Sequence, residues 1–455
     1  MSEKNLEQLF FEGNACMNAG DLHAAEQCFM DALQLDSQCG EVIANLAYLK
    51  EQQGQFSLAE EYYRQALTLL PKTVQIYLNL GVMLMKLKRF SDVERIYQAA
   101  FAIDPDVAAT WSNYGVLLAC TKREVEAEQC YRKALQLDPN YRKARFNLSY
   151  ILLRQGRYEE GWFCLESRDW QDLFSNYFYF RRWSGESLQG KSVVICFEGG
   201  HGDMIQFCRY ASVLKSLGAS KVSVICNPAI TDLLTRMDDV DEVFSYELDV
   251  NKFGWDFWTP SISLPYFCNT RLDTIPAKLP YLRADAEKIE AYSNVFSKEK
   301  LKVGVVWQGN TLFENNDDRS IAQLQTLRPL LEVSDIEFIS LQKGAGEVQV
   351  HQYTGRPLIA GGDLIKNFSD TAALIAHLDL VISVDTSVAH LAGAMGKACW
   401  VLLPDYRSDW RWMKARLDSP WYPDVMRLFR QMPDEDWGAV AIRVALALEY
   451  WKAKK

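Results

Sequence analysis

The sequence of 455 residues has no long hydrophobic run, no paired cysteine motif and no excess of positive charge. No apolar stretch approaches the roughly 18 residues that a membrane-spanning helix needs. The first residues, MSEKNLEQLF, lack the basic and apolar segments of a signal peptide. A formal charge of −10 argues against a surface for nucleic acid. The sequence therefore predicts a cytoplasmic protein with no transmembrane segment and no nucleic-acid partner.

The eleven cysteines form no Cys-x-x-Cys pair, and most lie within apolar segments. This pattern is typical of reduced core residues and not of a disulfide framework or a zinc site. We therefore predict no metal site and no cofactor. The length predicts two or three domains.

A 34-residue repeat occupies the first third of the chain. Pro71, Pro105 and Pro139 recur at this interval at the ends of helical patterns. Small residues recur in phase with them at Gly13, Ala47, Gly81 and Gly115, and aromatic residues at Phe29, Tyr63, Tyr97 and Tyr131. We expect the small residues to let paired helices approach closely, and the aromatic residues to fill the gap to the next pair.

This period and these positions resemble the tetratricopeptide repeat (TPR) family over about residues 4–168. The resemblance implies a TPR superhelix over residues 1–170, with four full repeats and a degenerate fifth. A TPR array has a concave face that usually binds proteins, so we expect a protein partner there. The alternative is a passive spacer or an arm for oligomerisation.

After residue 170 the hydrophobic period changes, and short β-branched runs alternate with helical patterns. Continuous apolar runs between helices are typical of buried parallel strands. The predicted strands are residues 192–197, 221–226 and 241–246, and then 301–307, 336–342, 378–384 and 398–404. They predict two doubly wound α/β domains, over residues 171–290 and 291–455.

Polar segments follow four of these strands. In open α/β sheets, ligands bind at the carboxyl ends of the strands. The loops after Phe197, Trp307, Leu341 and Val384 should therefore converge on one site.

The segment VISVDTSVAHLAGAMG ends a buried strand and begins a helix of small residues. Free backbone N–H groups and the hydroxyls of Thr386 and Ser387 would suit a phosphate. Asp385, Thr386 or Ser387 could equally act as a helix cap. His390, one turn into the helix, could face either the ligand or the core.

The segment EGGHGD, residues 198–203, follows the first strand. It is no dinucleotide fingerprint, because Ile205 stands where the third glycine is needed, and it lacks the Lys-Ser/Thr of a P-loop. Gly200 and Gly202 permit close approach of the backbone to a ligand. Asp203 could accept a proton or bind hydroxyls, although helix capping alone would also explain it.

Four segments together carry a second resemblance: GGHGDMIQFCRY, VGVVWQGN…DDRSI, DTSVAHLAGAMG and WVLLPDYRSDWRWM…DSPWYPDVMRLFRQ. Over about residues 190–432 the chain resembles bacterial glycosyltransferases of the GT-B architecture, related to heptosyltransferases. It is most similar to TPR-containing glycosyltransferases that include flagellin-modifying enzymes. The resemblance thus implies a TPR superhelix followed by two facing Rossmann-like domains. It also implies that the last helix (about 434–452) crosses back to the first of these two domains.

The resemblance implies a role for each loop. Asp203 matches the proposed base that deprotonates the acceptor hydroxyl, with His201 as the second candidate. Positions matching donor contacts are Gln308, Asn310, Arg319, Asp385, Thr386, Ser387 and His390. Arg319 or Lys343 could neutralise the leaving phosphate, so no metal is required. Trp410 and Arg411 could line the sugar or base site, although aromatic residues more often belong to the core.

The leading hypothesis is a metal-independent, inverting transfer of a sugar from a nucleotide-sugar to a protein acceptor held by the TPR arm. Flagellin Ser or Thr, modified with a nonulosonic acid, is the preferred example. One alternative is an inactive GT-B scaffold. Another is an enzyme that acts on lipopolysaccharide or another glycan, with the TPR arm serving oligomerisation.

Overall fold

The structure, a computed structural model, describes residues 5–169, 174, 177–248 and 254–455. It forms two compact units, Met1–Ile151 and Leu152–Lys455. The predicted domain boundary at residue 170 falls on a residue outside the described ranges. That boundary and the one at residue 290 stay predictions.

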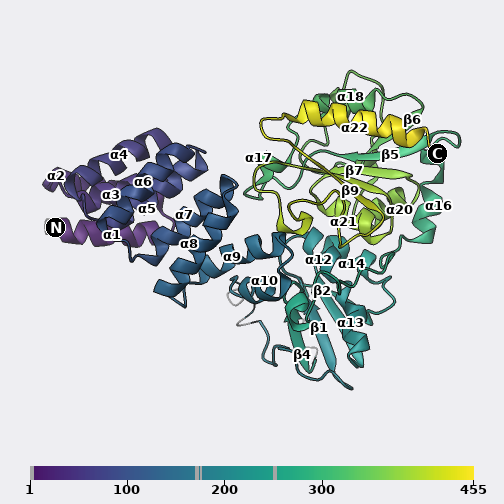
Figure 1. Ribbon diagram of the computed structural model, residues 1–455, viewed down its shortest axis with the longest axis horizontal. Coiled ribbons are helices and arrows are strands. Elements are labelled where there is room, and N and C mark those ends of the chain that lie inside the picture. Colours follow the sequence, from purple (N-terminus) through teal and green to yellow (C-terminus); the bar gives the residue numbers. More distant parts are fainter. Residues whose placement is uncertain (1–4, 170–173, 175–176, 249–253) are drawn as a thin grey trace. The chain divides into compact units, whose positions relative to one another are not determined.

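Successive antiparallel helical hairpins make up the first unit (Figure 1). Its helices are α1 Leu6–Asn18, α2 Leu22–Leu35, α3 Gly40–Gln52, α4 Phe56–Leu69, α5 Val74–Lys86, α6 Phe90–Ile103, α7 Ala108–Cys120 and α8 Glu124–Leu137. The next pair, α9 Arg142–Arg154 and α10 Tyr158–Leu165, leads into the second unit. The predicted 34-residue period is therefore the period of the helical pairs.

The small and aromatic positions of the repeat meet within each helical pair. A Cβ added to Gly81 would lie 2.2 Å from the ring of Tyr97, and one added to Gly13 would lie 2.5 Å from the ring of Phe29. Phe29 also shares a buried cluster with Leu46 of the following pair. The expected close approach is confirmed, and the aromatic ring fills space within its own pair as well as toward the next.

Ion pairs recur with the same period. Arg89 Nη1 lies 2.6 Å from Glu60 Oε2, and 34 residues later Arg123 Nη1 lies 2.8 Å from Glu94 Oε1. Each pair joins the second helices of neighbouring repeats. One sequence position thus makes the same contact in successive repeats.

The second unit contains two parallel sheets. The first has the order β3-β2-β1-β4, and the second has the order β6-β5-β7-β8-β9. The strands of the first sheet are β1 Ser192–Cys196, β2 Lys221–Cys226, β3 Glu242–Ser245 and β4 Phe257–Pro260. Those of the second are β5 Leu301–Val306, β6 Ile336–Ser340, β7 Leu380–Val384, β8 Cys399–Leu403 and β9 Met426–Arg430. The predicted order of helical pairs followed by two parallel sheets is confirmed.

All seven predicted strands are present, with ends within two residues of the prediction. Two strands were not predicted, β4 and β9. Their sequences, FWTP and MRLFR, mix aromatic, proline or charged residues and lack a continuous β-branched run. Each lies at the edge of its sheet, where its outer side meets an isolated bridge: Arg182 bridges Trp258 of β4, and Asp418 bridges Arg427 of β9.

The helices of the second unit cover both sheets (Figure 1). They are α12 His201–Phe207, α13 Tyr210–Ser216, α14 Pro228–Leu234, α15 Leu264–Phe267, α16 Ala286–Ala291, α17 Asn316–Arg319, α18 Arg328–Leu331, α19 Gln349–Gln352, α20 Phe368–Ala376, α21 Ser387–Ala394 and α22 Trp437–Lys452. Short 3-10 turns include η2 Ser261–Ser263, η3 Ser293–Val295, η4 Leu324–Leu327, η5 Gly361–Leu364 and η6 Trp410–Trp412.

The last helix, α22, packs on the second sheet. Its buried side chains, among them Val440, Val444 and Leu448, share a core with Val305 and Leu402. Its contacts with η4, α18 and β9 also lie in this half. The predicted crossing of α22 back to the first sheet stays a prediction. Among the described residues, no helix combines the length and apolar character needed to cross a bilayer.

Candidate functional site

The candidate site is defined by the carboxyl ends of β1 and β4 in the first sheet and of β5 and β7 in the second. Strand order reverses beside β1 in the first sheet and between β5 and β7 in the second. Such switch points are where open α/β sheets bind ligands. The segments that follow β1, β5 and β7 are those singled out in the sequence, and they contain Asp203, Arg319 and Asp385.

Helices α12 and α21, which follow β1 and β7, pack directly against each other. They approach closely at Gly202, where an added Cβ would lie 2.9 Å from His390 Cδ2 and 3.4 Å from Ser387 Cα. A methyl group at this position would therefore force the His390 ring or the helices to shift. The sequence analysis expected Gly202 to permit close approach of the backbone to a ligand. In the structure, its close neighbour is α21.

Asp203 is hydrogen bonded at both carboxylate oxygens. Its Oδ2 accepts the N–H of Gly200 at 2.7 Å, which caps the first turn of α12. Its Oδ1 accepts a hydrogen bond from Arg411 Nη2 and forms an ion pair with it. The side chain is 24% exposed. Asp203 thus caps a helix, as the simpler interpretation expected, and also joins the two halves of the unit.

Arg411, which lies in the second half of the unit, is the residue that binds Asp203 where α12 and α21 meet. We refer to this contact region as the junction of α12 and α21. The residue is buried, and its Nε donates to Gln206 Oε1 at 2.5 Å. Its Nη1 donates to Asp409 at 3.1 Å, and its guanidinium lies 4.4 Å from the centre of the Trp410 ring. Because the guanidinium is planar and held on several sides, it fixes the orientation of the Asp203 carboxylate.

Asp385 lies half-buried directly after β7. Burial, together with the negative charge of Asp409, raises the pKa of Asp385 to about 6. The positive charges of Arg319 and Arg411 act in the opposite direction. A carboxyl group in this state is neutral in an appreciable fraction of molecules near neutral pH.

His390 is a neutral, buried side chain. Burial and the charges of Arg411, Arg209 and Arg319 hold its pKa well below the usual value. Its Nδ1 lies 2.8 Å from the hydroxyl of Tyr422, and its ring stacks on Trp412. The structure therefore places His390 in the packed junction.

The start of α21 has one side chain already paired. Thr386 Oγ1 lies 2.9 Å from Ser383 Oγ, and the Thr386 side chain makes no cap on the helix. The first backbone N–H groups of α21 and the hydroxyl of Ser387 are at this end of the helix. It has the donors that an anion needs.

The segments after β5 and β6 are tied together by Gln342, a residue that the sequence analysis missed. Its Oε1 accepts the N–H groups of Trp307 and Gln308 at 3.1 and 2.9 Å, and its Nε2 donates to the carbonyls of Gln308 and Ala345. A buried Gln with both ends bonded fixes these loops. A lone Gln after a strand gives no sequence signal for this role.

Three predicted donor contacts are engaged within their own loops. Gln308 Nε2 donates to the carbonyl of Ala322 at 2.8 Å, and Asn310 Oδ1 accepts the N–H of Leu312 at 3.0 Å. Lys343 Nζ donates to Glu347 at 2.7 Å and to the carbonyl of Gly362 at 3.0 Å. The structure does not bring Lys343 into the junction of α12 and α21, and all three donor roles stay predictions.

Arg319 lies nearer to the junction. Its guanidinium is 4.3 Å from the centre of the Phe313 ring and packs against Gly309. Among the described residues, its Nε has no hydrogen-bond partner. Its charge lowers the pKa of Asp385, so the two side chains share one electrostatic environment.

Trp410 belongs to an aromatic core. It is 2% exposed and contacts the rings of Trp162 and Trp421 at 5.2 and 6.2 Å. It has little free surface for a ligand, as the simpler interpretation expected. Its face supports the Arg411 guanidinium instead.

His201 stands in a row of rings. The ring centres of Tyr246 and Phe197 are 5.8 Å apart, those of Phe197 and His201 are 6.2 Å apart, and those of His201 and Phe368 are 5.1 Å apart. Phe368 begins α20 in the second half, whereas the other three lie in the first half. Within the described part of the chain, His201 Nε2 is buried without a partner.

A second residue missed from the sequence is Arg209, which follows α12. This buried guanidinium donates to the carbonyl of Trp421 at 2.7 Å and to the hydroxyl of Tyr281 at 2.8 Å. It also lies 4.8 Å from the centre of the Tyr422 ring. Arg209 therefore joins α12 to the aromatic segment of the second half, a contact that needs residues 212 positions apart.

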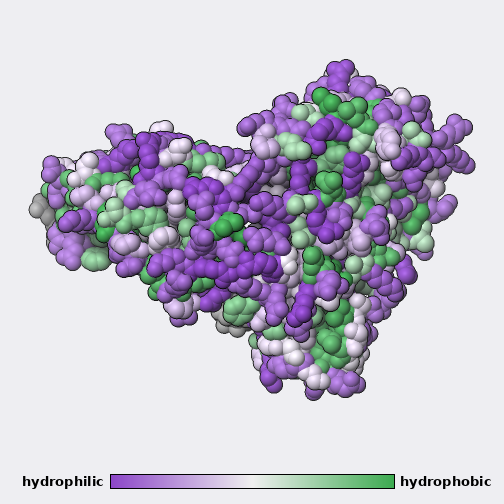
Figure 2. All heavy atoms as spheres, in the orientation of Figure 1, coloured by the Kyte–Doolittle hydropathy of each residue, from purple (hydrophilic) through white to green (hydrophobic). Residues whose placement is uncertain are grey.

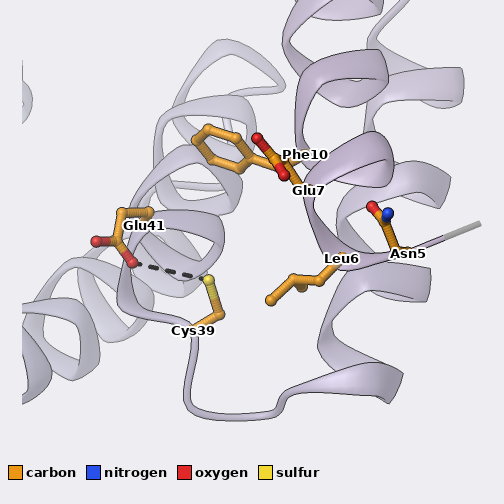
Figure 3. Close-up of a pocket in the computed structure, with 6 residues that line it drawn as sticks. All are labelled: Asn5, Leu6, Glu7, Phe10, Cys39 and Glu41. Carbon is orange, nitrogen blue, oxygen red and sulfur yellow. Dashed lines mark hydrogen bonds between the residues drawn. The ribbon is translucent and has the colours of Figure 1, made fainter.

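The first unit has a separate pocket of about 440 Å³ at its first helices (Figure 3). It is lined by Asn5, Leu6, Glu7, Phe10, Cys39 and Glu41. Cys39 Sγ lies 3.7 Å from Glu41 Oε2. None of the predicted site residues lines this pocket. Among the described residues, no group of three His, Cys, Asp or Glu side chains could hold a metal ion.

Comparison with family models identifies TPR sequences in the first part of the chain. Four models described as tetratricopeptide repeats match residues 9–39, 51–113, 108–141 and 130–163. The N-terminal region therefore consists of TPR repeats.

Comparison with whole proteins gives more distant similarities. Protein FlbA of Caulobacter vibrioides is 28% identical over 340 residues, which cover 68% of this chain. The match covers 55% of that protein, so the chain spans about half the length of this curated relative.

Among solved structures, a glycosyl transferase family 9 protein of Veillonella parvula is 13% identical, with a TM-score of 0.46. The match covers 60% of this chain and 99% of that one. MamA of Desulfovibrio magneticus is 16% identical, with a TM-score of 0.31, over 37% of this chain and 93% of that one.

Proposed function

We propose that this chain is a glycosyltransferase that moves a sugar from a nucleotide-sugar to a hydroxyl of a protein acceptor held by its TPR repeats. The observation that carries the proposal is the junction of α12 and α21. There a fixed carboxylate, Asp203, and a helix N-terminus suited to phosphate belong to segments at the switch points of two parallel sheets.

Asp203 is the proposed base. Gly200 N–H and Arg411 each bond one of its oxygens, which fixes the orientation of the carboxylate. Each oxygen has a second lone pair, so the acceptor hydroxyl can still donate to it. Such positioning of a base contributes about 10²–10⁴-fold to proton transfer. His201 remains the second candidate, since its Nε2 lacks a partner among the described residues.

The start of α21 is the proposed site for the donor phosphate. The bond from the sugar to the phosphate oxygen breaks as the acceptor oxygen bonds to the same sugar carbon, and the acceptor proton passes to Asp203. The negative charge that develops on the leaving phosphate would be stabilised by the helix N-terminus, Ser387 and Arg319. In this scheme the transfer is inverting and needs no metal.

Asp385 supports this assignment through its raised pKa. An ionised carboxylate at this position would repel a phosphate, whereas a neutral carboxyl group can donate a hydrogen bond to it. Because burial raises the pKa of Asp385 to about 6, protonating it costs little free energy near neutral pH. An incoming anion would raise that pKa further.

The TPR repeats are the proposed acceptor-binding region, since such arrays present an extended concave face for proteins. Flagellin Ser or Thr, modified with a nonulosonic acid, is the acceptor and sugar that we propose to test first. The proposal predicts that deletion of residues 1–140 abolishes protein modification while donor hydrolysis persists. Unchanged modification of the acceptor would contradict a docking role.

The deciding experiment is intact-mass analysis of flagellin co-expressed with the wild type or with Asp203→Asn. We expect the sugar mass with the wild type and its loss with Asp203→Asn. Asp335→Asn is the matched control, because Asp335 is 83% exposed and lies outside the junction. Sugar that persists at the wild-type level in Asp203→Asn would exclude Asp203 as the base.

A further inference from the structure

A buried pair of opposite charges adjoins the loop that carries Asp203. Hydrophilic side chains cover most of the face drawn in Figure 2, and the surface is where charged groups normally lie. Arg168 and Glu198 are exceptions, because their side chains are only 8% and 6% exposed. Apolar side chains of similar size often stabilise a fold at least as well as a buried ion pair does. We therefore looked for a further role of this pair.

Arg168 joins the segments that follow two neighbouring strands. Its Nε donates to Glu198 Oε1 at 2.7 Å and its Nη2 to Glu198 Oε2 at 2.8 Å, so the guanidinium grips both carboxylate oxygens. Its Nη2 also donates to Ser263 Oγ at 2.6 Å. Glu198 follows β1, and Ser263 lies in η2, which follows β4. One side chain thus fixes the carboxyl ends of the two strands that contribute to the candidate site from the first sheet.

The loop from Glu198 to Asp203 has little rigidity of its own. Gly199 and Gly200 are exposed, and glycine restricts the backbone less than any other residue. The N–H of Gly200 must nevertheless stay in place, because it donates to Asp203 Oδ2 at 2.7 Å. An anchored Glu198 limits where that N–H can lie. Arg168 therefore acts on Asp203 through Glu198 and Gly200.

Helix α10 supports the second partner of Asp203. Trp162 in α10 is 2% exposed, and its Nε1 donates to the carbonyl of Thr270 at 2.9 Å. Its ring centre lies 5.2 Å from that of Trp410, whose face supports the guanidinium of Arg411. Arg411 in turn binds Asp203 Oδ1. Both hydrogen bonds of Asp203 thus lead back to α10 and the residues that follow it.

We propose that Arg168 is a positioning residue, which holds the loop of residues 198–203 in the conformation that orients Asp203. The inference deepens the proposed function and rests on it, since Asp203 is the base proposed there. A planar guanidinium suits this role, because it binds a carboxylate at two points where an ammonium group binds at one. Arg168 follows α10, the last helix in the region matched to TPR repeats. The chain at the end of the repeats is therefore part of the support of the site, and not only a linker.

Hydrogen exchange of the full chain tests the positioning and needs no substrate. Arg168→Lys keeps the positive charge but loses the two-point grip, so we expect the amides of residues 199–203 to exchange about tenfold faster than in the wild type. Arg443→Lys is the matched control, because Arg443 grips Glu435 in the same way, at 2.8 and 2.7 Å, within the second half of the unit. We expect this control to leave the loop unchanged.

Two outcomes of this measurement would overturn the proposal. One is exchange of the loop at the wild-type rate in Arg168→Lys. The other is faster exchange throughout β1 and β4 as well as in the loop, because the pair would then serve the stability of the whole sheet.

Sugar transfer tests the consequence for Asp203. The rate at which co-expressed flagellin gains the sugar mass, per folded enzyme, should fall about tenfold or more in Arg168→Lys and not in Arg443→Lys. Glu198→Gln breaks the same grip from the other side and should give a similar fall. Glu166, 2.7 Å from Arg168 Nη1, still balances the Arg168 charge in that variant. The double variant should be no slower than either single variant, because all three lose one shared contact.

The two measurements separate the positioning role from the proposed function. Faster exchange in the loop with an unchanged rate of transfer would overturn the positioning role. A wild type that adds no sugar to flagellin would contradict the proposed function there, whereas faster exchange in the loop of Arg168→Lys would still support the hold of Arg168 on it.

Discussion

The two units of this protein obtain their close packing in different ways. In the first unit, Gly81 contacts Tyr97, 16 residues away, and the same contact recurs from Gly115 to Tyr131. In the second, Gly202 contacts His390, which lies 188 residues further along the chain. A contact between residues that are close in the sequence leaves a pattern there when it recurs in each repeat. A single contact between residues far apart in the sequence does not.

The largest effect is expected from Gly81→Ala, which tests the packing inside a repeat. The new methyl group would lie 2.2 Å from the buried ring of Tyr97, so the ring or the helices must shift. We expect a loss of about 3 kcal/mol in the free energy of unfolding, measured by urea denaturation. Hydrogen exchange should quicken in α5 and α6 and not in the strands. Gly54→Ala is the control, since its Cβ would meet nothing within 4 Å and costs only the strain of its positive φ.

Gly202→Ala makes the corresponding change at the junction of α12 and α21. Its Cβ would lie 2.9 Å from His390 Cδ2 and 3.4 Å from a backbone atom, a milder overlap than at Gly81. We expect a loss of about 2 kcal/mol, with faster hydrogen exchange in α12 and α21. Gly200→Ala, whose Cβ would lie at an ordinary 3.5 Å from Asp203, should be nearly neutral. Equal stability of the two variants would contradict the tight junction.

Asp385→Asn tests whether a buried carboxyl group weakens the second unit. Because the pKa of Asp385 is raised to about 6 in the folded state, the contribution of Asp385 to wild-type stability falls as the pH rises from about 4 through 6. The Asn side chain does not ionise, so Asp385→Asn does not lose this stability as the pH rises. We expect it to be more stable than the wild type by about 1 kcal/mol at pH 8, with the difference vanishing below pH 4. This is a fraction of the roughly 3 kcal/mol of the full shift, because Asp385 is only half-buried and solvent screens it. Thermal melts across this pH range measure it, and a difference independent of pH would refute the raised pKa.

The smallest effect is expected from Glu94→Gln, which breaks one of the repeated ion pairs of the first unit. Both partners, Glu94 and Arg123, are about 40% exposed, so solvent screens their attraction. We expect the melting temperature to fall by about 1 °C or less in low salt, and by nothing measurable in high salt. A large shift would mean that this periodic pair, and not apolar packing, holds successive repeats together.

Local patterns made much of the fold predictable. The 34-residue period predicted the helical pairs, because each repeat buries its small and aromatic positions against near neighbours in the sequence. Seven apolar runs predicted seven strands for a similar reason, since a strand buried on both faces is apolar throughout. The edge strands β4 and β9 were missed because their sequences lack that signature.

The candidate site was predictable only in part. The sequence placed Asp203 and Asp385 after strands, and parallel sheets bring such segments to the same edge. It could not show that Arg411 reaches Asp203 or that Gln342 fixes two loops. Each of these contacts depends on side-chain geometry across elements that the sequence does not place next to one another.

By itself, then, the sequence determined the TPR period and the set of parallel strands, because both follow from periodic burial along a short stretch of chain. The tertiary structure decided what the segment EGGHGD contacts. It set Gly202 against α21, paired Asp203 with Arg411, and placed His201 in a row of rings that ends at Phe368. These partners lie between 167 and 208 residues from the side chains that they meet, and only the packing of the two sheets of the second unit brings them together.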